Sequence, residues 1–133
     1  MPQNSKKALI TGVAGQDGTI LSQILINEGY QVTGLIKPGT GADTLLRYAP
    51  EVKILEVELS DQDHMEKTIV DTNPDEIYNF GGISSIVESV NNPELTHEVN
   101  VGSVQAILRG MATLQQNSHS PKLVAAASGT IFE

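Results

Sequence analysis

Short apolar runs alternate with longer amphipathic stretches along most of this chain. The runs have the length and composition of strands, which predicts β-strands at residues 7–12, 31–37, 52–58, 76–80 and 123–127. The stretches between them repeat apolar residues at helical spacing, as in Ile20/Ile24 and Leu21/Leu25, which predicts helices at residues 17–28, 61–71 and 93–116. Strands joined by helix-length crossovers pair in parallel with right-handed connections. The pattern therefore predicts an α/β fold, a three-layer doubly wound parallel sheet with strand order 3-2-1-4-5.

Capping residues support two of the predicted helices. Ser60 or Asp61 is expected to cap the helix at 61–71, and Asn92 the helix that begins with Pro93. The longer connections are predicted to be loops, with one helical turn at 44–48 and a short helix within 81–90. The helix at 93–116 has more apolar residues than one face can hold, which indicates either burial between the sheet and a neighbouring helix or a second face in a subunit contact.

Composition and charge argue against several function classes. The chain has 133 residues, enough for one domain with its own core. Its 16 acidic and 8 basic residues give a formal net charge of −8, whereas nucleic acids and membrane surfaces attract a basic face. It has no cysteine, its three histidines lack metal-ligand spacing, and no apolar run approaches the ~20 residues that span a bilayer. We therefore expect a cytoplasmic protein without a metal site and without nucleic-acid or membrane partners.

The strongest chemical signal is the glycine-rich segment 11–18, which follows the first apolar run directly. Three glycines spaced three residues apart, between a strand and a helix, are typical of a turn that binds a pyrophosphate in Rossmann-type folds. Gly12 is expected to allow the tight turn, Gly15 to let backbone N–H groups approach the phosphate, and Gly18 to let the helix lie close to the strand. A glycine-rich turn without a ligand is the alternative.

The predicted topology brings several segments to one crevice. With strand order 3-2-1-4-5, the crevice lies at the carboxyl ends of the first and fourth strands. Its predicted lining consists of Gly12–Gly18, Lys37, Phe80–Ser84 and Ser128. Lys37 ends the second strand, where an acidic residue would bind the adenosine ribose of NAD. A lysine there favours NADP as the cofactor, with NAD as the alternative, because lysine can pair with a 2′-phosphate.

Several motifs resemble a known family. The opening Thr-Gly-x-x-Gly-Gln-Asp-Gly at 11–18 is similar to that of the extended short-chain dehydrogenase/reductases that modify nucleotide sugars. Within that group, the segment from Glu76 to Ser84, then Ser89 and the run Pro93–Thr96, resembles the GDP-mannose 4,6-dehydratases most closely. The resemblance covers essentially the whole chain. It implies an NAD(P)-dependent, homo-oligomeric enzyme that oxidises a nucleotide sugar at C4, eliminates water and reduces the product.

The resemblance also implies roles for individual residues. Its cofactor-binding positions correspond to Gly12, Gly15, Gln16, Asp17 and Gly18 at the pyrophosphate, Lys37 and Leu59 at the adenosine, and Phe80, Gly81, Gly82 and Ser84 toward the nicotinamide. Ser128 matches the catalytic serine or threonine whose hydroxyl binds the 4-oxygen of the sugar, although a serine that only closes a buried strand is the alternative. Thr130, the second candidate catalytic residue, stands where dehydratases have the glutamate that removes the C5 proton.

Three positions depart from the dehydratase pattern. With Thr130, the segment 128–132 is more similar to the corresponding segment of the related 4-epimerases. Glu58 replaces an aspartate near the adenine, and Pro38 replaces the second of two arginines around the adenosine ribose. A nucleotide-sugar 4-epimerase or reductase is therefore the alternative function.

The Tyr-x-x-x-Lys pair that serves as acid and base in this group does not occur in the chain. The fourth residue after each of the three tyrosines is Gly34, Val52 or Gly82. We therefore expect residues 1–133 to be the N-terminal, dinucleotide-binding fragment of a longer enzyme, without its sugar-binding domain and inactive alone. A non-catalytic nucleotide-binding module is the alternative.

Overall fold

The computed structural model describes residues 6–80 and 93–125. Its elements follow the order expected from the sequence: β1 (Lys7–Thr11), α1 (Gln16–Asn27), β2 (Gln31–Ile36), α2 (Asp43–Tyr48), β3 (Lys53–Glu56), α3 (Gln62–Thr72), β4 (Glu76–Asn79), α5 (Pro93–Gln116) and β5 (Lys122–Ala125). The expected short helix within 81–90, the Asn92 cap and the last two residues of the predicted fifth strand lie outside the described residues.

The sheet has five strands in the order β3-β2-β1-β4-β5, and every pair is parallel. This confirms the predicted fold class and strand order. β1 lies at the centre and pairs with β2 on one side and β4 on the other. The winding therefore reverses between β1 and β4, whose carboxyl ends lie at the same edge of the sheet.

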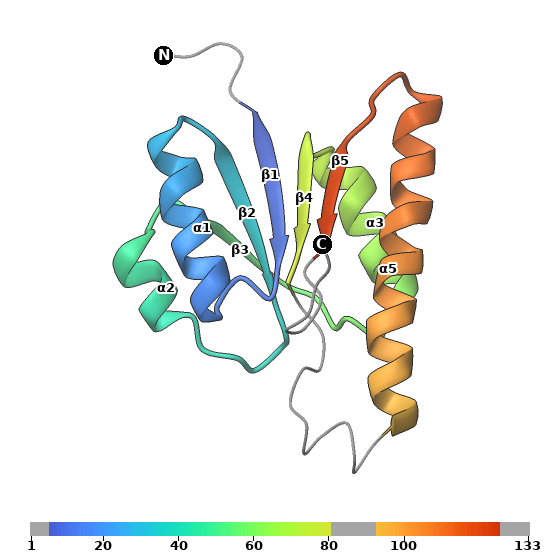
Figure 1. Cartoon of the computed structure of the whole chain (residues 1–133), viewed down its shortest axis with the longest axis horizontal. Helices are drawn as coiled ribbons and strands as arrows, with labels where there is room; N and C mark the ends of the chain where they lie inside the picture. The colour runs from blue at the N-terminus through green and yellow to red at the C-terminus, as the bar shows by residue number, and fades with distance from the viewer. Residues whose placement is uncertain (1–5, 81–92, 126–133) are drawn as a thin grey trace.

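Helices cover both faces of the sheet in three layers (Figure 1). One core lies between the sheet and the helices α1 and α2, and is formed by Ala8, Ile10, Val13, Leu25, Val32, Ile36, Leu45, Ala49 and Val52. The second core lies on the side of α3 and α5, and is formed by Leu9, Leu35, Val57, Met65, Ile69, Ile77, Ala106, Ile107 and Leu114. Successive residues of β1 enter opposite cores, as strand geometry requires.

The helix α5 packs closely against α3. A Cβ at Gly110 would lie 2.7 Å from side-chain atoms of Ile69, so only glycine permits this approach. Beside this contact, Arg109 of α5 donates hydrogen bonds to Glu66 and Gln62 of α3, at 3.0 and 3.1 Å. The expected burial of α5 against a neighbouring helix is thus confirmed for one of its faces.

Other apolar residues of the helices remain exposed. Ile20 and Ile24 of α1 are each 48% exposed, whereas Leu25 is buried. Of the two apolar pairs that predicted this helix, Leu21 and Leu25 therefore face the core, whereas Ile20 and Ile24 do not. On α5, Val101 and Leu108 are also exposed, so the helix carries a second apolar surface. No helix in the described parts of the chain is long and apolar enough to cross a membrane.

Candidate functional site

Three of the segments that the sequence assigns to a crevice meet at one edge of the sheet. The glycine loop follows β1, Lys37 follows β2, and Phe80 follows β4. These strands are neighbours in the sheet, with β1 in the middle. The structure therefore brings the described candidates to the carboxyl edge of β2, β1 and β4. Of the remaining candidates, Gly81, Gly82, Ser84, Ser128 and Thr130 lie outside the described residues.

The glycine loop has the conformation that a tight strand-to-helix turn requires. Gly12 has a φ of +63°, a left-handed conformation that favours glycine. The N–H of Gly15 donates a 3.2 Å hydrogen bond to the carbonyl of Gly12, which closes the turn. A Cβ at Gly18 would lie 2.5 Å from the carbonyl oxygen of Val13. The first turn of α1 thus lies directly against the end of β1, and a side chain at Gly18 would force them apart.

The start of α1 is open toward solvent. Gly15 is the N-cap of the helix, is exposed, and supplies no side-chain cap. A Cβ at Gly15 would meet only the Gly12 carbonyl, at 3.5 Å, so glycine is not needed there for packing. The first N–H groups of a helix have no intrahelical acceptor and favour an anion. Gln16 and Asp17 are exposed in this first turn, and we expect Asp17 to contribute its N–H group, since its carboxylate would repel a phosphate.

The other described candidates follow β2, β3 and β4 and lie in different environments. Lys37 is exposed directly after β2, which leaves its ammonium group available to an anionic ligand. Leu59 is half-buried and packs against the core on the α3 side. Phe80 packs against the core on the α1 side, and its ring lies 6.4 Å from that of Tyr78 in a tilted arrangement. Leu59 and Phe80 therefore take part in the packing beneath this edge of the sheet.

A cleft that the sequence did not reveal adjoins the glycine loop. It has a volume of about 520 Å³ and lies between α1 and α2, lined by Ala14, Gly15, Gln16, Thr19, Ile20, Gln23, Thr44 and Tyr48. Gly15 and Gln16 belong to both the cleft and the glycine loop. Ile20, noted above as exposed, is one of the residues that line this cleft.

A buried polar pair at the same edge was also missed. The Thr11 hydroxyl donates a 2.6 Å hydrogen bond to Oδ1 of Asn79, at the ends of β1 and β4. Both side chains are buried. The sequence carried a signal for this pair, because each residue is polar at the end of an otherwise apolar strand, and neighbouring parallel strands end at the same edge.

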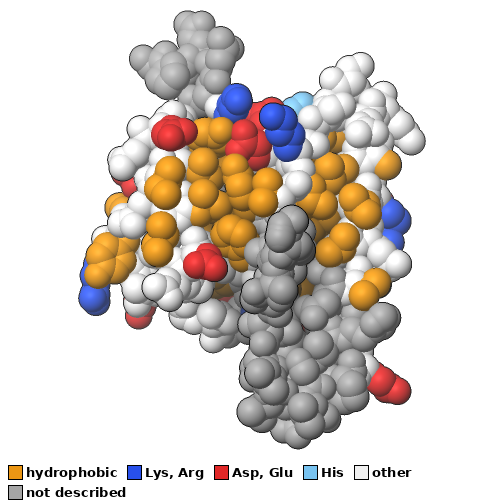
Figure 2. Space-filling view, viewed as in Figure 1, with side chains coloured by type: hydrophobic (Ala, Val, Ile, Leu, Met, Phe, Trp, Pro, Cys, Tyr) orange, Lys and Arg blue, Asp and Glu red, His pale blue; other side chains and the backbone are white. Residues whose placement is uncertain are grey.

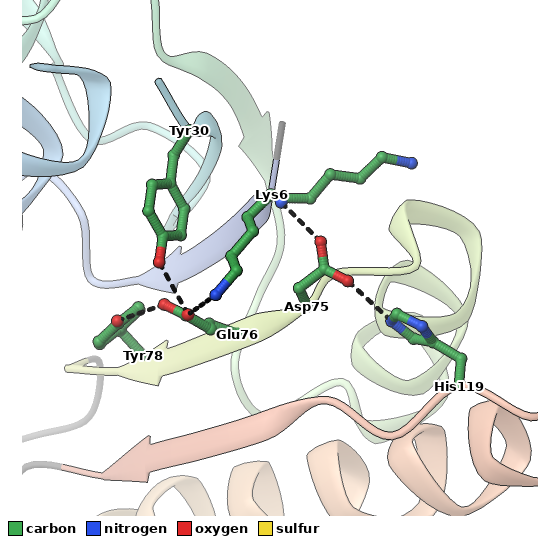
Figure 3. Close-up of polar contacts among 7 residues, drawn as sticks. Lys6, Tyr30, Asp75, Glu76, Tyr78 and His119 are labelled. Carbon is green, nitrogen blue, oxygen red and sulfur yellow. Dashed lines mark hydrogen bonds and ion pairs between the residues drawn. The ribbon is translucent and has the colours of Figure 1, made fainter. Parts of the chain in front are cut away.

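A carboxylate cluster occupies the opposite edge of the sheet (Figure 3). Glu76, the first residue of β4, accepts hydrogen bonds from the hydroxyls of Tyr30 and Tyr78, at 2.8 and 2.6 Å, and lies 3.9 Å from the Lys6 ammonium group. The hydrogen bond to Glu76, together with burial, raises the pKa of Tyr30 to about 12. Burial is the larger cause for Tyr78, and with Glu76 it raises the pKa of that phenol as well.

The neighbouring residue Asp75 joins β1 to the turn before β5. One of its carboxylate oxygens accepts a 2.8 Å hydrogen bond from the backbone N–H of Lys7, and the other lies 3.6 Å from Nε2 of His119 (Figure 3). The same Nε2 lies 2.7 Å from the carbonyl oxygen of Pro74, to which it donates. These contacts hold the start of β1 and the turn before β5 close to the start of β4. Within the described residues, no group of three or more acidic or histidine side chains is arranged to hold a metal ion.

On the face of the sheet that carries α1, apolar side chains also gather next to this helix, in the region between α1 and α5 (Figure 2). The described helices on this side cover β1 to β3, whereas none lies over β4 and β5 (Figure 1). Tyr78 and Phe80 of this region are half-buried, and Val124 of β5 is 46% exposed. This face of β4 and β5 therefore lacks a helical layer from the described residues.

Among the solved structures with a similar fold are two UDP-glucose 4-epimerases. UDP-glucose 4-epimerase from Thermotoga maritima, determined with UDP-glucose, superposes with a TM-score of 0.79 at 21% identity, over 92% of this chain and 38% of that chain. UDP-glucose 4-epimerase from Bifidobacterium longum, determined with NAD+ and UDP, has a TM-score of 0.77 at 24% identity, over 92% of this chain and 37% of that chain. At these identities, the likeness shows the shared fold.

Sequence comparison identifies the family more narrowly. The family model described as GDP-mannose 4,6 dehydratase matches residues 9–132. GDP-mannose 4,6-dehydratase from Vibrio cholerae is 33% identical over 118 residues, which are 82% of this chain and 32% of the relative. The chain thus spans about a third of the length of the curated relatives it matches. Because the family match covers nearly every residue, the chain belongs to the GDP-mannose 4,6-dehydratase family.

Proposed function

We propose that this chain binds a nicotinamide dinucleotide and forms the cofactor-binding part of a nucleotide-sugar dehydratase. The observation that carries the proposal is the glycine loop, in which Gly18 lies against the backbone of Val13 and α1 begins with unshielded N–H groups. This geometry fits a pyrophosphate, because no side chain caps the first N–H groups of α1, and residues 15–17 at the start of the helix are exposed. The family match and the NAD+ complex of a structural neighbour support the same assignment.

NADP is the preferred dinucleotide in this proposal, with NAD as the alternative. Lys37 is exposed after β2, next to the expected position of the adenosine ribose, and its charge suits a 2′-phosphate. The segment from Phe80 to Ser84 would lie near the nicotinamide half, and Leu59 near the adenine. When bound, the dinucleotide would accept a hydride from the sugar and later return it.

The reacting sugar would be positioned by residues after β5. Ser128 would donate a hydrogen bond to the 4-oxygen, and Thr130 would occupy the position next to C5. Because the chain contains no Tyr-x-x-x-Lys pair, we propose that these 133 residues bind the dinucleotide without completing the sugar chemistry.

Calorimetric titration of the chain with NADPH and NADH tests the cofactor proposal. We expect NADPH to bind more tightly, and Lys37→Ala to abolish the difference, because only the 2′-phosphate distinguishes the two ligands. Lys53→Ala is the matched control, since Lys53 is an exposed lysine at the start of β3, away from the carboxyl edge. Equal affinities in the wild-type chain would refute the role given to Lys37. Absence of binding by either dinucleotide would refute the cofactor proposal itself.

The 4-epimerases are the second candidate, favoured by Thr130 in place of the dehydratase glutamate. The two reactions differ in product mass, because dehydration removes water and epimerisation leaves the mass unchanged. Mass spectrometry of the products from GDP-mannose and UDP-glucose, with a protein that includes this chain and its natural flanking sequence, separates them. Sequencing the coding region around residues 1–133 separates both from a non-catalytic module, which would lack a downstream Tyr-x-x-x-Lys pair.

A further inference from the structure

The groove between α1 and α2 is continuous along most of α1. The cleft of about 520 Å³ beside the glycine loop adjoins a smaller hollow of about 220 Å³, and Gln23 and Tyr48 line both of them. Gln16, Ile20 and Gln23 recur at helical spacing on α1, and the groove separates them from Thr44 and Tyr48 of α2. The Gln23 carboxamide donates a long hydrogen bond of 3.4 Å to the Tyr48 carbonyl, which links the two helices in the middle of the groove.

A well-buried hydroxyl borders the wider cleft. Thr19 lines this cleft, although the residue is only 8% exposed. Within the described part of the chain, its hydroxyl has no hydrogen-bond partner. By contrast, the hydroxyls of Ser22 and Thr68 each donate a 2.7 Å bond to the carbonyl four residues earlier, as is common inside helices. Because an unpaired polar group is costly to bury, the Thr19 hydroxyl favours a ligand that can bond to it.

The geometry points to the wider cleft as a binding site for a neutral, planar nitrogen heterocycle of the nucleobase type. The site adjoins the crevice proposed for the dinucleotide but is distinct from it. Tyr48, which is 56% exposed, and Ile20 offer apolar surface on which such a ring can stack. The Thr19 hydroxyl and the carboxamides of Gln16 and Gln23 offer donors and acceptors that ring nitrogens and exocyclic groups can match.

The charge and size of the cleft support this class of ligand. None of the described residues that line it carries a formal charge, so a neutral ring loses less on desolvation than an ion that finds no partner there. Its volume lies within the range of roughly 300–1,000 Å³ that is usual for small-molecule sites.

Nuclear magnetic resonance titration of the 133-residue chain with adenosine tests the site. We expect the backbone amide signals of Thr19, Gln23 and Tyr48 to shift. Tyr48→Ala should raise Kd about tenfold, the equivalent of one stacked ring, whereas Tyr48→Phe, which keeps the ring, should leave Kd near the wild-type value. Leu46→Ala is the matched control, because it removes another exposed apolar side chain of α2 that does not line the cleft.

A second pair of variants examines the buried hydroxyl. Thr19→Val should raise the Kd of adenosine about fivefold, the equivalent of one hydrogen bond, and Thr19→Ser should restore most of the affinity. Ribose, which is neutral but not planar, should shift none of the three amide signals. Binding of ribose as tight as that of adenosine would show a saccharide site and overturn the proposal.

Two other results would also overturn it. One is a set of shifts confined to the carboxyl ends of β1, β2 and β4, because adenosine would then occupy the dinucleotide crevice. The other is an unchanged Kd in Tyr48→Ala. The inference does not depend on the proposed function, since a chain that binds adenosine in the cleft and fails to bind NADPH would refute the cofactor proposal alone.

Discussion

The hydroxyl of Tyr30 donates a 2.8 Å hydrogen bond to Oε2 of Glu76, and thereby ties the residue before β2 to the first residue of β4. Tyr78 donates to the other carboxylate oxygen of Glu76. The carboxylate is thus shared by two phenols, and its negative charge disfavours a second negative charge on either of them.

We expect Glu76→Gln to lower the pKa of both phenols by different amounts. The hydrogen bond to Glu76 is the main cause of the raised pKa of Tyr30, which should fall from about 12 toward the ordinary value near 10. Tyr78 should fall less, because burial is its main cause and persists in the variant. Ultraviolet titration of phenolate absorbance in a Tyr48→Phe background measures both. Glu66→Gln, on the other side of the sheet, is the control and should leave both curves unchanged.

The same bond predicts how stability depends on pH. The pKa of Tyr30 is higher in the folded chain than in the unfolded chain, so folding favours the protonated phenol. Its contribution is complete below about pH 10 and is lost as the pH rises through about 12. Denaturant unfolding at a series of alkaline pH values should therefore show a shallower decline for Tyr30→Phe than for wild type. An identical decline would show that this bond does not couple to folding.

Gly18→Ala should destabilise the fold and weaken dinucleotide binding together. The added Cβ would lie 2.5 Å from the Val13 carbonyl, so α1 must move away from β1. Overpacking of this kind costs roughly 1–3 kcal/mol of unfolding free energy. Gly41→Ala is the matched control, because a Cβ there meets nothing within 4 Å and the φ is not positive. Denaturant unfolding and NADPH titration should be measured for both variants. If Gly18→Ala and Gly41→Ala had the same unfolding free energy and the same affinity for NADPH, the close approach of α1 to β1 at Gly18 would be contradicted.

Asp61→Ala should lower the unfolding free energy by about 1 kcal/mol. The Asp61 side chain accepts a 3.1 Å hydrogen bond from the N–H of His64 and so caps α3. Asp61→Asn should retain most of the stability, because an asparagine oxygen can accept the same bond. Urea denaturation followed by circular dichroism measures the unfolding free energy of both variants. If Asp61→Asn lost as much stability as Asp61→Ala, the hydrogen bond to His64 would not be the source of the stabilisation.

We expect the chain to self-associate through one of two exposed apolar regions. Val124 lies on β5, an edge strand of the described sheet, and Val101 and Leu108 lie on the outer side of α5. Sedimentation velocity at micromolar concentration should show a dimer or a larger species. Val124→Lys should dissociate it if strand edges pair, since a charge on an edge opposes pairing, whereas Leu108→Gln should do so if helices pack. A monomeric wild-type chain would contradict both modes.

The sequence predicted the sheet order because each strand has its own apolar run and each crossover has helical length. It predicted β3 too long, since the apolar run continues past the paired residues. Val57 follows the last strand residue, Glu56, yet is buried and donates a 2.9 Å hydrogen bond to Ile36. Hydrophobicity marks burial, and burial here extends beyond the ladder. Of the two capping residues proposed for α3, the structure selects Asp61.

Within the site, local patterns were sufficient for the glycine loop and insufficient for contacts between distant segments. The conformation of Gly12 and the close approach at Gly18 follow from their spacing between a strand and a helix. The bonds of Tyr30 to Glu76 and of Thr11 to Asn79 join residues 46 and 68 positions apart. A local pattern can mark one such residue, but it does not show which distant residue is its partner. The cleft beside the glycine loop depends on how α2 docks, which periodicity does not define.

The central position of β1 has a consequence for synthesis on the ribosome. β1 can pair with β2 as soon as β2 has emerged, but its other edge must wait for β4, which ends at Asn79. During that interval a strand rich in buried side chains presents an open edge, at the stage when nascent chains are most exposed to mispairing. The crevice at the switch point therefore cannot form cotranslationally before β4 is made, and conditions that slow translation between β3 and β4 would lengthen the vulnerable period.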